Sequence, residues 1–123
     1  MTALKRGTGV LVPFPFSDQV GFKKRPALVV STDVYNAAGP DIMIAQITSR
    51  LNAPPHPGDH RIVDWQRAGL LLPSLLRARV TTLEALHVLR VMGTLGPDDI
   101  VSVDRGLRDA LGLAQARGLG VLR

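Results

Sequence analysis

The stretch Lys23-Lys24-Arg25-Pro26 places three cations immediately before an apolar run that continues to Thr32. Pro26 restricts the backbone of Arg25 to extended geometry. The guanidinium is therefore partly preoriented, and two of its coplanar N–H groups can bind two phosphate oxygens at once. Most basic runs are solvated loops, so on the residues alone a functional and an ordinary Arg25 are equally open.

Two further groups of side chains have the chemistry to bind a phosphodiester. Thr48 and Ser49 end an alternating apolar run and are followed by Arg50. Their hydroxyls suit a phosphoryl group, although threonine is common in strands and serine in turns. Arg77 and Arg79 share one face of a predicted strand, and such a basic stripe can follow a phosphate backbone. An exposed strand face explains the stripe equally well.

Aromatic and histidine side chains give weaker signals. Phe22 lies in the basic loop and is placed to stack on a base, whereas Phe14 and Phe16 share a strand face and are expected in the core. His56 and His60 flank part of a proline-rich loop, but their spacing matches no known ligand pattern, so we predict no metal and no cofactor. The sequence has no glycine-rich phosphate loop and no serine–histidine–aspartate signature.

The composition limits the class of protein. The chain has 123 residues, of which 46% are hydrophobic, which suits one domain with one core. A net charge of +5 favours a polyanionic partner such as RNA, DNA or an acidic protein over an indifferent basic surface. The absence of cysteine excludes disulfides and thiol catalysis and suits the cytoplasm. We expect no signal peptide, and no apolar run reaches the roughly 18 residues of a membrane helix.

About six short strands and one helix would position these residues. The predicted strands cover residues 9–16, 26–32, 41–49, 60–65, 75–83 and 88–92. Loops are predicted over 17–24, 33–40 and 52–59, and a helical turn near 82–86. Pro13 should end the first strand or place it at an edge, because proline lacks the N–H that a sheet ladder needs.

The C-terminal helix is predicted to begin after Gly96, which suits the N-cap position. Pro97 suits the first helical position, and Asp98 and Asp99 complement the helix dipole. Gly112 can end the helix. The apolar stripe between these ends consists of Ile100, Val103, Leu107 and Leu111. Together the elements predict an α+β, mostly β fold, in which a helix packs on a bent sheet or partly open barrel.

Several fragments taken together resemble a known family. The fragments "VLVPFPFSD", "KKRPALVVS", "YN", "IAQITSR", "DWQRAGLLLPSLLRARVTTL" and "MGTLGPDDI" occur in the order found in the MazF/PemK toxins of bacterial type II toxin–antitoxin systems. Each fragment is unspecific alone, whereas the ordered set, from about Gly7 to Leu113, is specific. The resemblance implies an SH3-like small β-barrel (CcdB/MazF-like) with a C-terminal helix. It also implies one toxin domain over residues 1–113 and a flexible tail over 114–123.

The resemblance also implies a function. Toxins of this family are metal-independent, sequence-specific endoribonucleases. They cut single-stranded RNA to 2′,3′-cyclic phosphate and 5′-hydroxyl ends and so inhibit translation and growth. The family's catalytic arginine and threonine fall on Arg25 and Thr48, Ser49 follows as a helper, and Arg77 falls at a basic RNA contact. The other RNA-binding residues that we expect are Lys23, Lys24, Phe22, Arg50 and Arg79.

The expected partners are single-stranded RNA, a second copy of the chain in a homodimer, and a cognate antitoxin. Family antitoxins carry an acidic, disordered C-terminal segment that covers the RNA groove, and a basic toxin suits such a segment. We expect the protein in the cytoplasm, with no membrane partner. The cleaved RNA motif and the identity of the antitoxin are not encoded in any pattern of this chain.

Two alternative functions stay open. One is a non-catalytic toxin of the same fold, such as the gyrase-poisoning CcdB toxins, and the other is an RNA-binding protein without catalysis. The family usually has an acidic residue where this chain has Thr8 and Gly9. If that acid orients Arg25, activity would be altered here. The presence of "KRP" together with "ITS" favours the nuclease, because neither alternative needs both.

Overall fold

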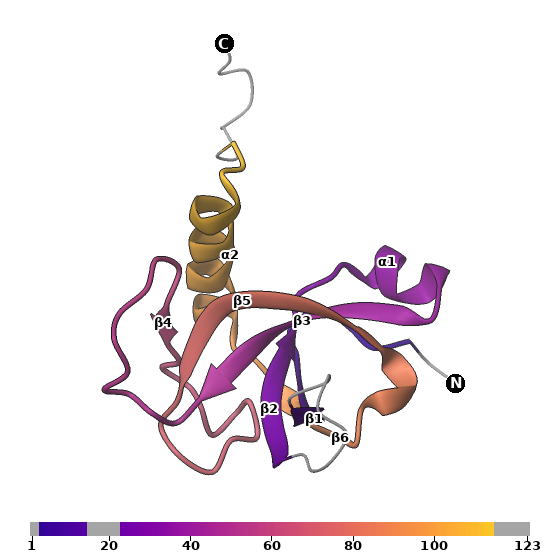
Figure 1. The fold of residues 1–123 in the computed structure, drawn as a ribbon, viewed down its shortest axis with the longest axis horizontal. Coiled ribbons are helices and arrows are strands. Elements are labelled where there is room, and N and C mark those ends of the chain that lie inside the picture. The colour runs from indigo at the N-terminus through magenta and orange to yellow at the C-terminus, as the bar shows by residue number, and fades with distance from the viewer. Residues whose placement is uncertain (1–2, 15–22, 115–123) are drawn as a thin grey trace.

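Six strands form one antiparallel sheet in the computed structural model, which describes residues 3–14 and 23–114. The strands are β1 (Thr8–Phe14), β2 (Lys23–Val29), β3 (Asp41–Thr48), β4 (His60–Arg61), β5 (Leu75–Glu84) and β6 (Arg90–Thr94). Their order across the sheet is β4-β5-β3-β2-β1-β6. The sheet curls, with β5 arching across it and helix α2 standing at its side (Figure 1). The predicted class, a mostly β half-open barrel with a C-terminal helix, is confirmed.

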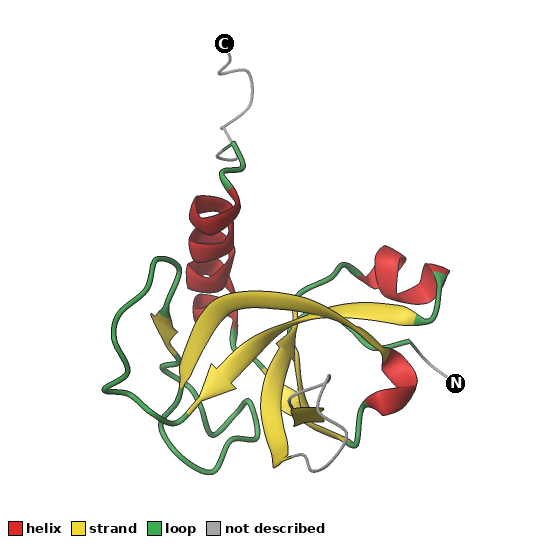
Figure 2. Cartoon of the chain, in the orientation of Figure 1, coloured by secondary structure: helices red, strands yellow, loops and turns green. Residues whose placement is uncertain are grey.

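Helix α1 (Asp33–Ala38) joins β2 to β3, the 3-10 turn η1 (Ala85–His87) lies between β5 and β6, and helix α2 (Pro97–Leu111) follows β6 (Figure 2). The prediction of a loop over 33–40 is wrong. Thr32 caps α1, since its side chain accepts a hydrogen bond from the N–H of Tyr35 at 3.2 Å. A helix of six residues is too short to show the periodic pattern that identifies longer helices.

Both faces of the sheet are buried, and β3 shows how one strand serves both. Ala45 and Ile47 belong to the core beneath α2, whereas Ile42 and Ile44 belong to the core on the opposite face. This separation is the one that strict alternation predicts. The core opposite α2 consists of Val10, Val12, Ala27, Val29, Ile42, Ile44 and Leu83. We call the face that carries this second core the inner face.

The edge position predicted at Pro13 is confirmed. Pairing between β1 and β6 stops at Leu11, while pairing with β2 continues through Pro13 to Phe14. Pro13 therefore lies where its missing N–H interrupts no ladder. The strand predicted over 26–32 is confirmed as β2, which lies between β1 and β3 but begins at Lys23 rather than at Pro26. The rest of the predicted 17–24 loop lies outside the described residues.

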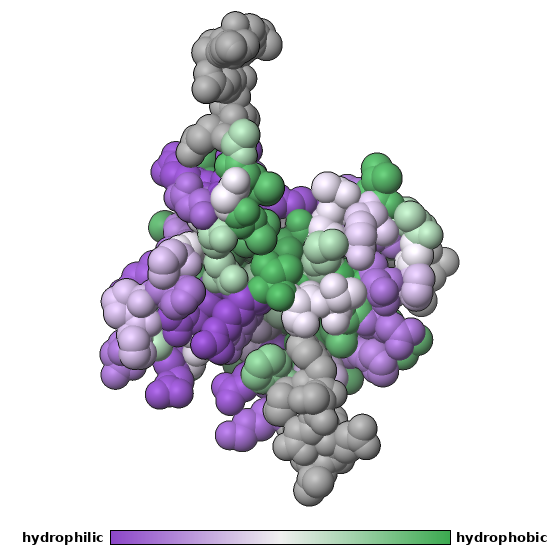
Figure 3. Space-filling view, turned by 45° about the horizontal axis from the view of Figure 1, so that its top comes forward, coloured by the Kyte–Doolittle hydropathy of each residue, from purple (hydrophilic) through white to green (hydrophobic). Residues whose placement is uncertain are grey.

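The helix α2 begins and ends as predicted. Gly96 is the N-cap, Pro97 opens the first turn, and Gly112 adopts a left-handed conformation at φ 70°. Of the predicted stripe, Val103 is buried and Ile100 and Leu107 pack against the core, but Leu111 is 61% exposed. The stripe prediction is wrong for Leu111, because α2 extends past the sheet at that end (Figure 1). Figure 3 shows apolar side chains gathered along this helix.

The strand predicted over 60–65 is shortened to His60–Arg61. Beyond it, Asp99 from the first turn of α2 accepts hydrogen bonds from the N–H groups of Val63 at 2.9 Å and Asp64 at 3.0 Å. The carboxylate of Asp99 thus accepts backbone hydrogen bonds that the carbonyl groups of a neighbouring strand would otherwise accept. The last predicted strand is confirmed with shifted bounds as β6, and the predicted turn before it is η1. All but the first residue of the predicted 114–123 tail lies outside the described residues.

Candidate functional site

Arg25 stands at the point where β2 leaves the inner face of the sheet. It pairs with Val12 across β1. Ala27 and Val29 follow Arg25 along the strand and lie on the same face. They are buried, with 2% and 0% of their surface exposed, whereas Arg25 is exposed. These two buried residues hold the strand in place, and alternation therefore puts the side chain of Arg25 at the edge of the core. Lys23 shares this face, and Lys24 lies on the other.

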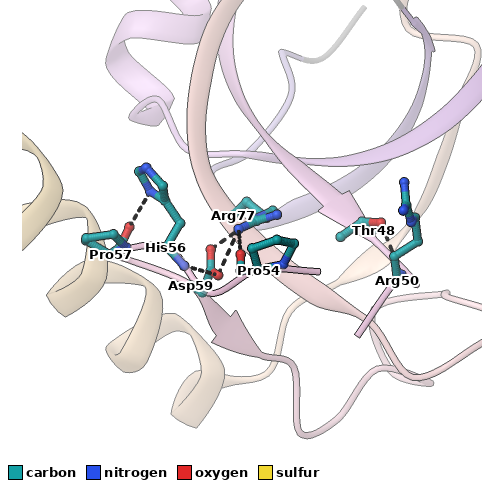
Figure 4. A network of polar contacts seen from close by, with 7 residues as sticks. All are labelled: Thr48, Arg50, Pro54, His56, Pro57, Asp59 and Arg77. Atoms are coloured by element: carbon teal, nitrogen blue, oxygen red, sulfur yellow. Dashed lines mark hydrogen bonds and ion pairs between the residues drawn. The ribbon is translucent and has the colours of Figure 1, made fainter. Parts of the chain in front are cut away.

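Thr48 ends β3 on the same inner face. Its Oγ1 accepts a hydrogen bond from the N–H of Arg50 at 3.1 Å, which fixes the turn after the strand (Figure 4). A hydroxyl that accepts from the backbone still has its own proton to donate. Thr48 can therefore serve as a fixed hydrogen-bond donor to an anionic ligand.

An irregularity in β5 brings two arginines beside Thr48. Ala45 pairs with Val80, and Ile47 pairs with Leu76. Between these pairs β3 has one residue, at position 46, whereas β5 has three, at 77–79. Extra residues in one strand bend it and re-aim its side chains. This bulge lies opposite the end of β3, so residues 77–79 of β5 can form one side of the site.

These elements enclose a cavity of about 260 Å³, which we call the arginine pocket. Its lining residues are Phe14, Arg25, Gln46, Thr48, Arg50, Ala53, Pro54, Arg77 and Arg79. The side chains of four arginines and one threonine thus line the same cavity. Within the described part of the chain, no carboxylate and no imidazole belongs to this lining. Such a set of donors is suited to a phosphodiester, because guanidinium groups match pairs of phosphate oxygens.

One of the four arginines is already paired. The Nε of Arg77 donates to Oδ1 of Asp59 at 3.1 Å, and its Nη2 donates to Oδ2 at 3.2 Å and to the carbonyl oxygen of Pro54 at 2.7 Å (Figure 4). Asp59 also accepts from the N–H of His56 at 2.9 Å. We call this set of contacts the Arg77–Asp59 clasp. It ties the proline-rich 52–59 loop to β5.

The other predicted site residues are placed as follows. Arg50 and Arg79 are exposed and line the arginine pocket, together with Arg25 and Thr48. Ser49 is exposed after the end of β3 and is not part of the pocket lining. Lys23 and Lys24 are exposed on β2 outside the lining as well. Phe22 lies outside the described residues.

Four residues of the pocket lining were not predicted: Ala53 and Pro54 in the 52–59 loop, and Phe14 and Gln46 on the strands. Phe14 was expected in the core, but it is only partly buried and lines the cavity. Gln46 was not predicted as a site residue. A usable signal was present for Phe14 and Gln46: each continues the face of buried residues, Val12 in β1 and Ile44 in β3, one step beyond the core.

The departure at Thr8 and Gly9 lies away from Arg25. Thr8 is four residues from Val12, the partner of Arg25, which corresponds to roughly 13 Å along the strand. Val10 and Val12, both almost fully buried, lie between. An acidic side chain at position 8 would therefore not contact Arg25 directly in this fold. The missing acid gives no support to an inactive site.

The histidine of β4 is committed to a structural contact. His60 Nε2 lies 2.7 Å from Oδ1 of Asp99, a carboxylate with 2% of its surface exposed. Burial disfavours the charged form of Asp99, but the hydrogen bonds from Val63, Asp64 and His60 outweigh it. The pKa of Asp99 is therefore lowered below its ordinary value. Among residues 3–14 and 23–114, no three histidine, aspartate or glutamate side chains cluster as metal ligands would.

Comparison with known proteins identifies the family. The model of the PemK-like, MazF-like toxins of type II toxin–antitoxin systems matches residues 5–111. The chain belongs to this toxin family. A search of curated protein sequences returned no match. Of the two helices that the structure describes, neither combines the length and the hydropathy needed to cross a bilayer.

Solved structures of MazF-like proteins share the fold. One is an endoribonuclease in complex with its cognate antitoxin from a Mycobacterial species, with a TM-score of 0.74 and 20% identity over 94% of this chain and 100% of that one. The toxin MazF-mt6 of Mycobacterium tuberculosis gives 0.71 and 18% over 88% and 99%. A MazE–MazF complex of Deinococcus radiodurans gives 0.73 and 23% over 91% and 99%. The MazF-like architecture predicted from the sequence is therefore confirmed.

Proposed function

We propose that this MazF-like toxin is a metal-independent endoribonuclease that cuts single-stranded RNA at a short sequence motif and thereby inhibits translation and growth. The observation that carries the proposal is the convergence of Arg25 and Thr48, from two different strands, on one cavity with three further arginines. The endoribonuclease names of the similar Mycobacterial structures are consistent with it.

The proposed reaction is an internal transesterification. The ribose 2′-oxygen attacks the adjacent phosphorus, and the bond from phosphorus to the 5′-oxygen breaks. The products are a 2′,3′-cyclic phosphate and a 5′-hydroxyl. The proton lost by the 2′-hydroxyl is balanced by the proton gained by the leaving oxygen, so no water or cofactor is consumed.

Arg25 and Thr48 would act on the charge that develops during this reaction. The five-coordinate phosphorus carries extra negative charge on its equatorial oxygens. Arg25 would hold these oxygens and deliver or relay a proton to the leaving oxygen, and Thr48 would donate its hydroxyl proton to the same group. Donors fixed where charge develops are commonly worth about 3–4 kcal/mol each. Arg50 and Arg79 would hold the neighbouring phosphates, and Lys23, Lys24, Phe22 and Ser49 would contact RNA further out.

For Arg77 we propose a role in the shape of the site rather than a phosphate contact. Its Nε and Nη2 both donate to Asp59, and Nη2 also donates to Pro54. A guanidinium held in this way is neutralised locally by the carboxylate. The Arg77–Asp59 clasp would therefore keep Ala53 and Pro54 in place as the outer wall of the arginine pocket.

The test is cleavage of a long single-stranded RNA by the purified protein in EDTA, with the 5′ ends mapped. Discrete cuts with 5′-hydroxyl ends are expected. Arg25→Ala should lower the rate by about a hundredfold or more, as expected for loss of one transition-state donor. The matched control is Arg105→Ala, because Arg105 is exposed on α2 and lies outside the pocket lining. This control loses the same charge and should cut normally.

The alternatives predict different results. A folded protein that binds RNA without cutting it would be an RNA-binding protein. A protein that neither binds nor cuts RNA but arrests growth would point to a protein target, as in the CcdB toxins. Cutting that survives Arg25→Ala would show that the arginine pocket is not the catalytic site.

We further propose the partners and location that the family resemblance implies. These are a homodimer in the cytoplasm and an antitoxin whose acidic, disordered segment covers the arginine pocket. Light scattering of the purified chain tests the dimer. An acidic antitoxin peptide should inhibit RNA cleavage more weakly as salt rises, because the attraction between opposite charges is screened.

A further inference from the structure

A second cavity adjoins the arginine pocket on the inner face. It has a volume of about 340 Å³, within the range of roughly 300–1,000 Å³ that is usual for small-molecule sites. Val12, Ala27 and Ile44 contribute apolar walls, and the ring of Phe14 lies at its edge. We call this cavity the apolar pocket. Val12, Ala27 and Ile44 belong to the buried core, so packing holds this side of the cavity in place.

Gln46 brings an unsatisfied polar group into this apolar setting. Its side chain lines the apolar pocket, and its Oε1 is buried. Among residues 3–14 and 23–114, this oxygen has no hydrogen-bond partner. A buried acceptor without a partner destabilises the fold, so its presence beside a cavity points to a ligand that supplies the missing donor.

The two cavities share one boundary. Phe14, Arg25, Gln46 and Arg79 line both of them. Arg25, which we propose holds the scissile phosphate, thus lies between the arginine pocket and the apolar pocket. A ligand that fills both would join an anionic group to a largely apolar group that carries an N–H donor. A nucleotide has this construction.

We propose that the apolar pocket is a nucleobase subsite for a base next to the scissile phosphate, and that Gln46 determines which base it takes. This subsite presupposes the ribonuclease function proposed above. The base would lie against Phe14, since aromatic rings stack on any base. Oε1 of Gln46 would accept an N–H from the edge of the base, while the amide nitrogen donates to a ring nitrogen beside it.

Adenine is the base expected in this subsite. A glutamine amide matches the N6 amino group and a neighbouring ring nitrogen of adenine, and this is the usual pairing of glutamine with a base. The stacking surface of Phe14 does not discriminate among bases. Selection therefore depends on the amide of Gln46.

The first experiment compares cleavage maps of wild type and Gln46→Leu on one RNA pool with randomised positions. Leucine has a similar size and suits the apolar walls, so the variant should fold. Wild type should prefer adenine at one position next to the cut. Gln46→Leu should lose about tenfold of that preference, the scale expected for one bidentate pair, while the other motif positions and the 5′-hydroxyl ends stay unchanged. Gln66→Leu, at an exposed glutamine, is the matched control.

The second experiment measures binding without cleavage. Adenosine, cytidine, guanosine and uridine 3′-monophosphates are titrated into the protein while the side-chain amide of Gln46 is followed by NMR. Adenosine 3′-monophosphate should shift this amide, and Gln46→Leu should weaken its binding about tenfold. This readout is independent of turnover, so it supports or refutes the subsite even if the protein does not cut RNA.

The outcomes separate the subsite from the nuclease. If RNA is cut and Gln46→Leu leaves every base frequency unchanged, the subsite is refuted while the nuclease function stands. If RNA is not cut but the nucleotide shifts the Gln46 amide, the nuclease function fails and the subsite stands. If no nucleotide perturbs Gln46, the subsite is refuted.

Discussion

Breaking the Arg77–Asp59 clasp should destabilise the protein by an amount that follows from its geometry. The side chains of Arg77 and Asp59 are only 13% and 14% exposed, and they share two hydrogen bonds. Exposed ion pairs are worth about 0–1 kcal/mol, whereas removing one partner of a buried pair costs about 3–5 kcal/mol. For a pair at this intermediate depth we expect about 2 kcal/mol for either Arg77→Met or Asp59→Asn.

The assay is a double-mutant cycle in urea unfolding at one fixed protein concentration, because the stability of an oligomer depends on concentration. The double variant should be little less stable than either single variant, with a coupling energy of about 1.5–2 kcal/mol between positions 77 and 59. Losses that simply add, within about 0.5 kcal/mol, would refute the clasp as a coupled pair.

The same variants separate the two possible roles of Arg77. If Arg77 holds the loop, both single variants should slow RNA cleavage to a similar extent under conditions where each is fully folded. If Arg77 instead binds a phosphate, Asp59→Asn should keep or raise the affinity for RNA, because it frees a guanidinium. A normal cleavage rate in Asp59→Asn together with a slow rate in Arg77→Met would refute the positioning role.

Three further predictions concern stability and RNA binding. Asp99→Asn should cost about 3 kcal/mol, because it removes a buried charged acceptor. Folding lowers the pKa of Asp99, so the contribution of its carboxylate to the free energy of unfolding is complete above the unfolded-state pKa of roughly 3.9. This contribution fades as the pH falls toward the folded-state pKa. Urea unfolding of Asp99→Asn at several pH values should therefore show a weaker acid dependence than unfolding of the wild type. Gly69→Ala should cost about 3 kcal/mol or more in urea unfolding, because Gly69 has φ +82° and an added Cβ would lie 2.2 Å from the carbonyl oxygen of Met92; a loss below 1 kcal/mol would contradict the fold there. Arg50→Gln should lower the slope of log affinity against log salt for single-stranded RNA by about 0.7, and an unchanged slope would exclude a phosphate contact.

The misplaced elements show where sequence patterns lose information. Helix α1 depends on one cap at Thr32 and is too short for a periodic signal. The strand after His60 ends early because Asp99, nearly forty positions later, captures the backbone of Val63 and Asp64. A single cap does not identify so short a helix, and the contact that ends the strand joins residues that are distant in sequence.

The sequence by itself determined the class of fold, the alternation in β3, the limits of α2, and the residue types able to bind a phosphodiester. These properties are local, because strand alternation, helix capping and side-chain chemistry depend on neighbours in the chain. Only the tertiary structure decided which of these side chains meet. It gathered Arg25, Thr48, Arg50 and Arg79 in one pocket and placed Gln46 between two cavities, because the pairing of β2 with β3 and the bulge in β5 bring distant segments to one face of the sheet.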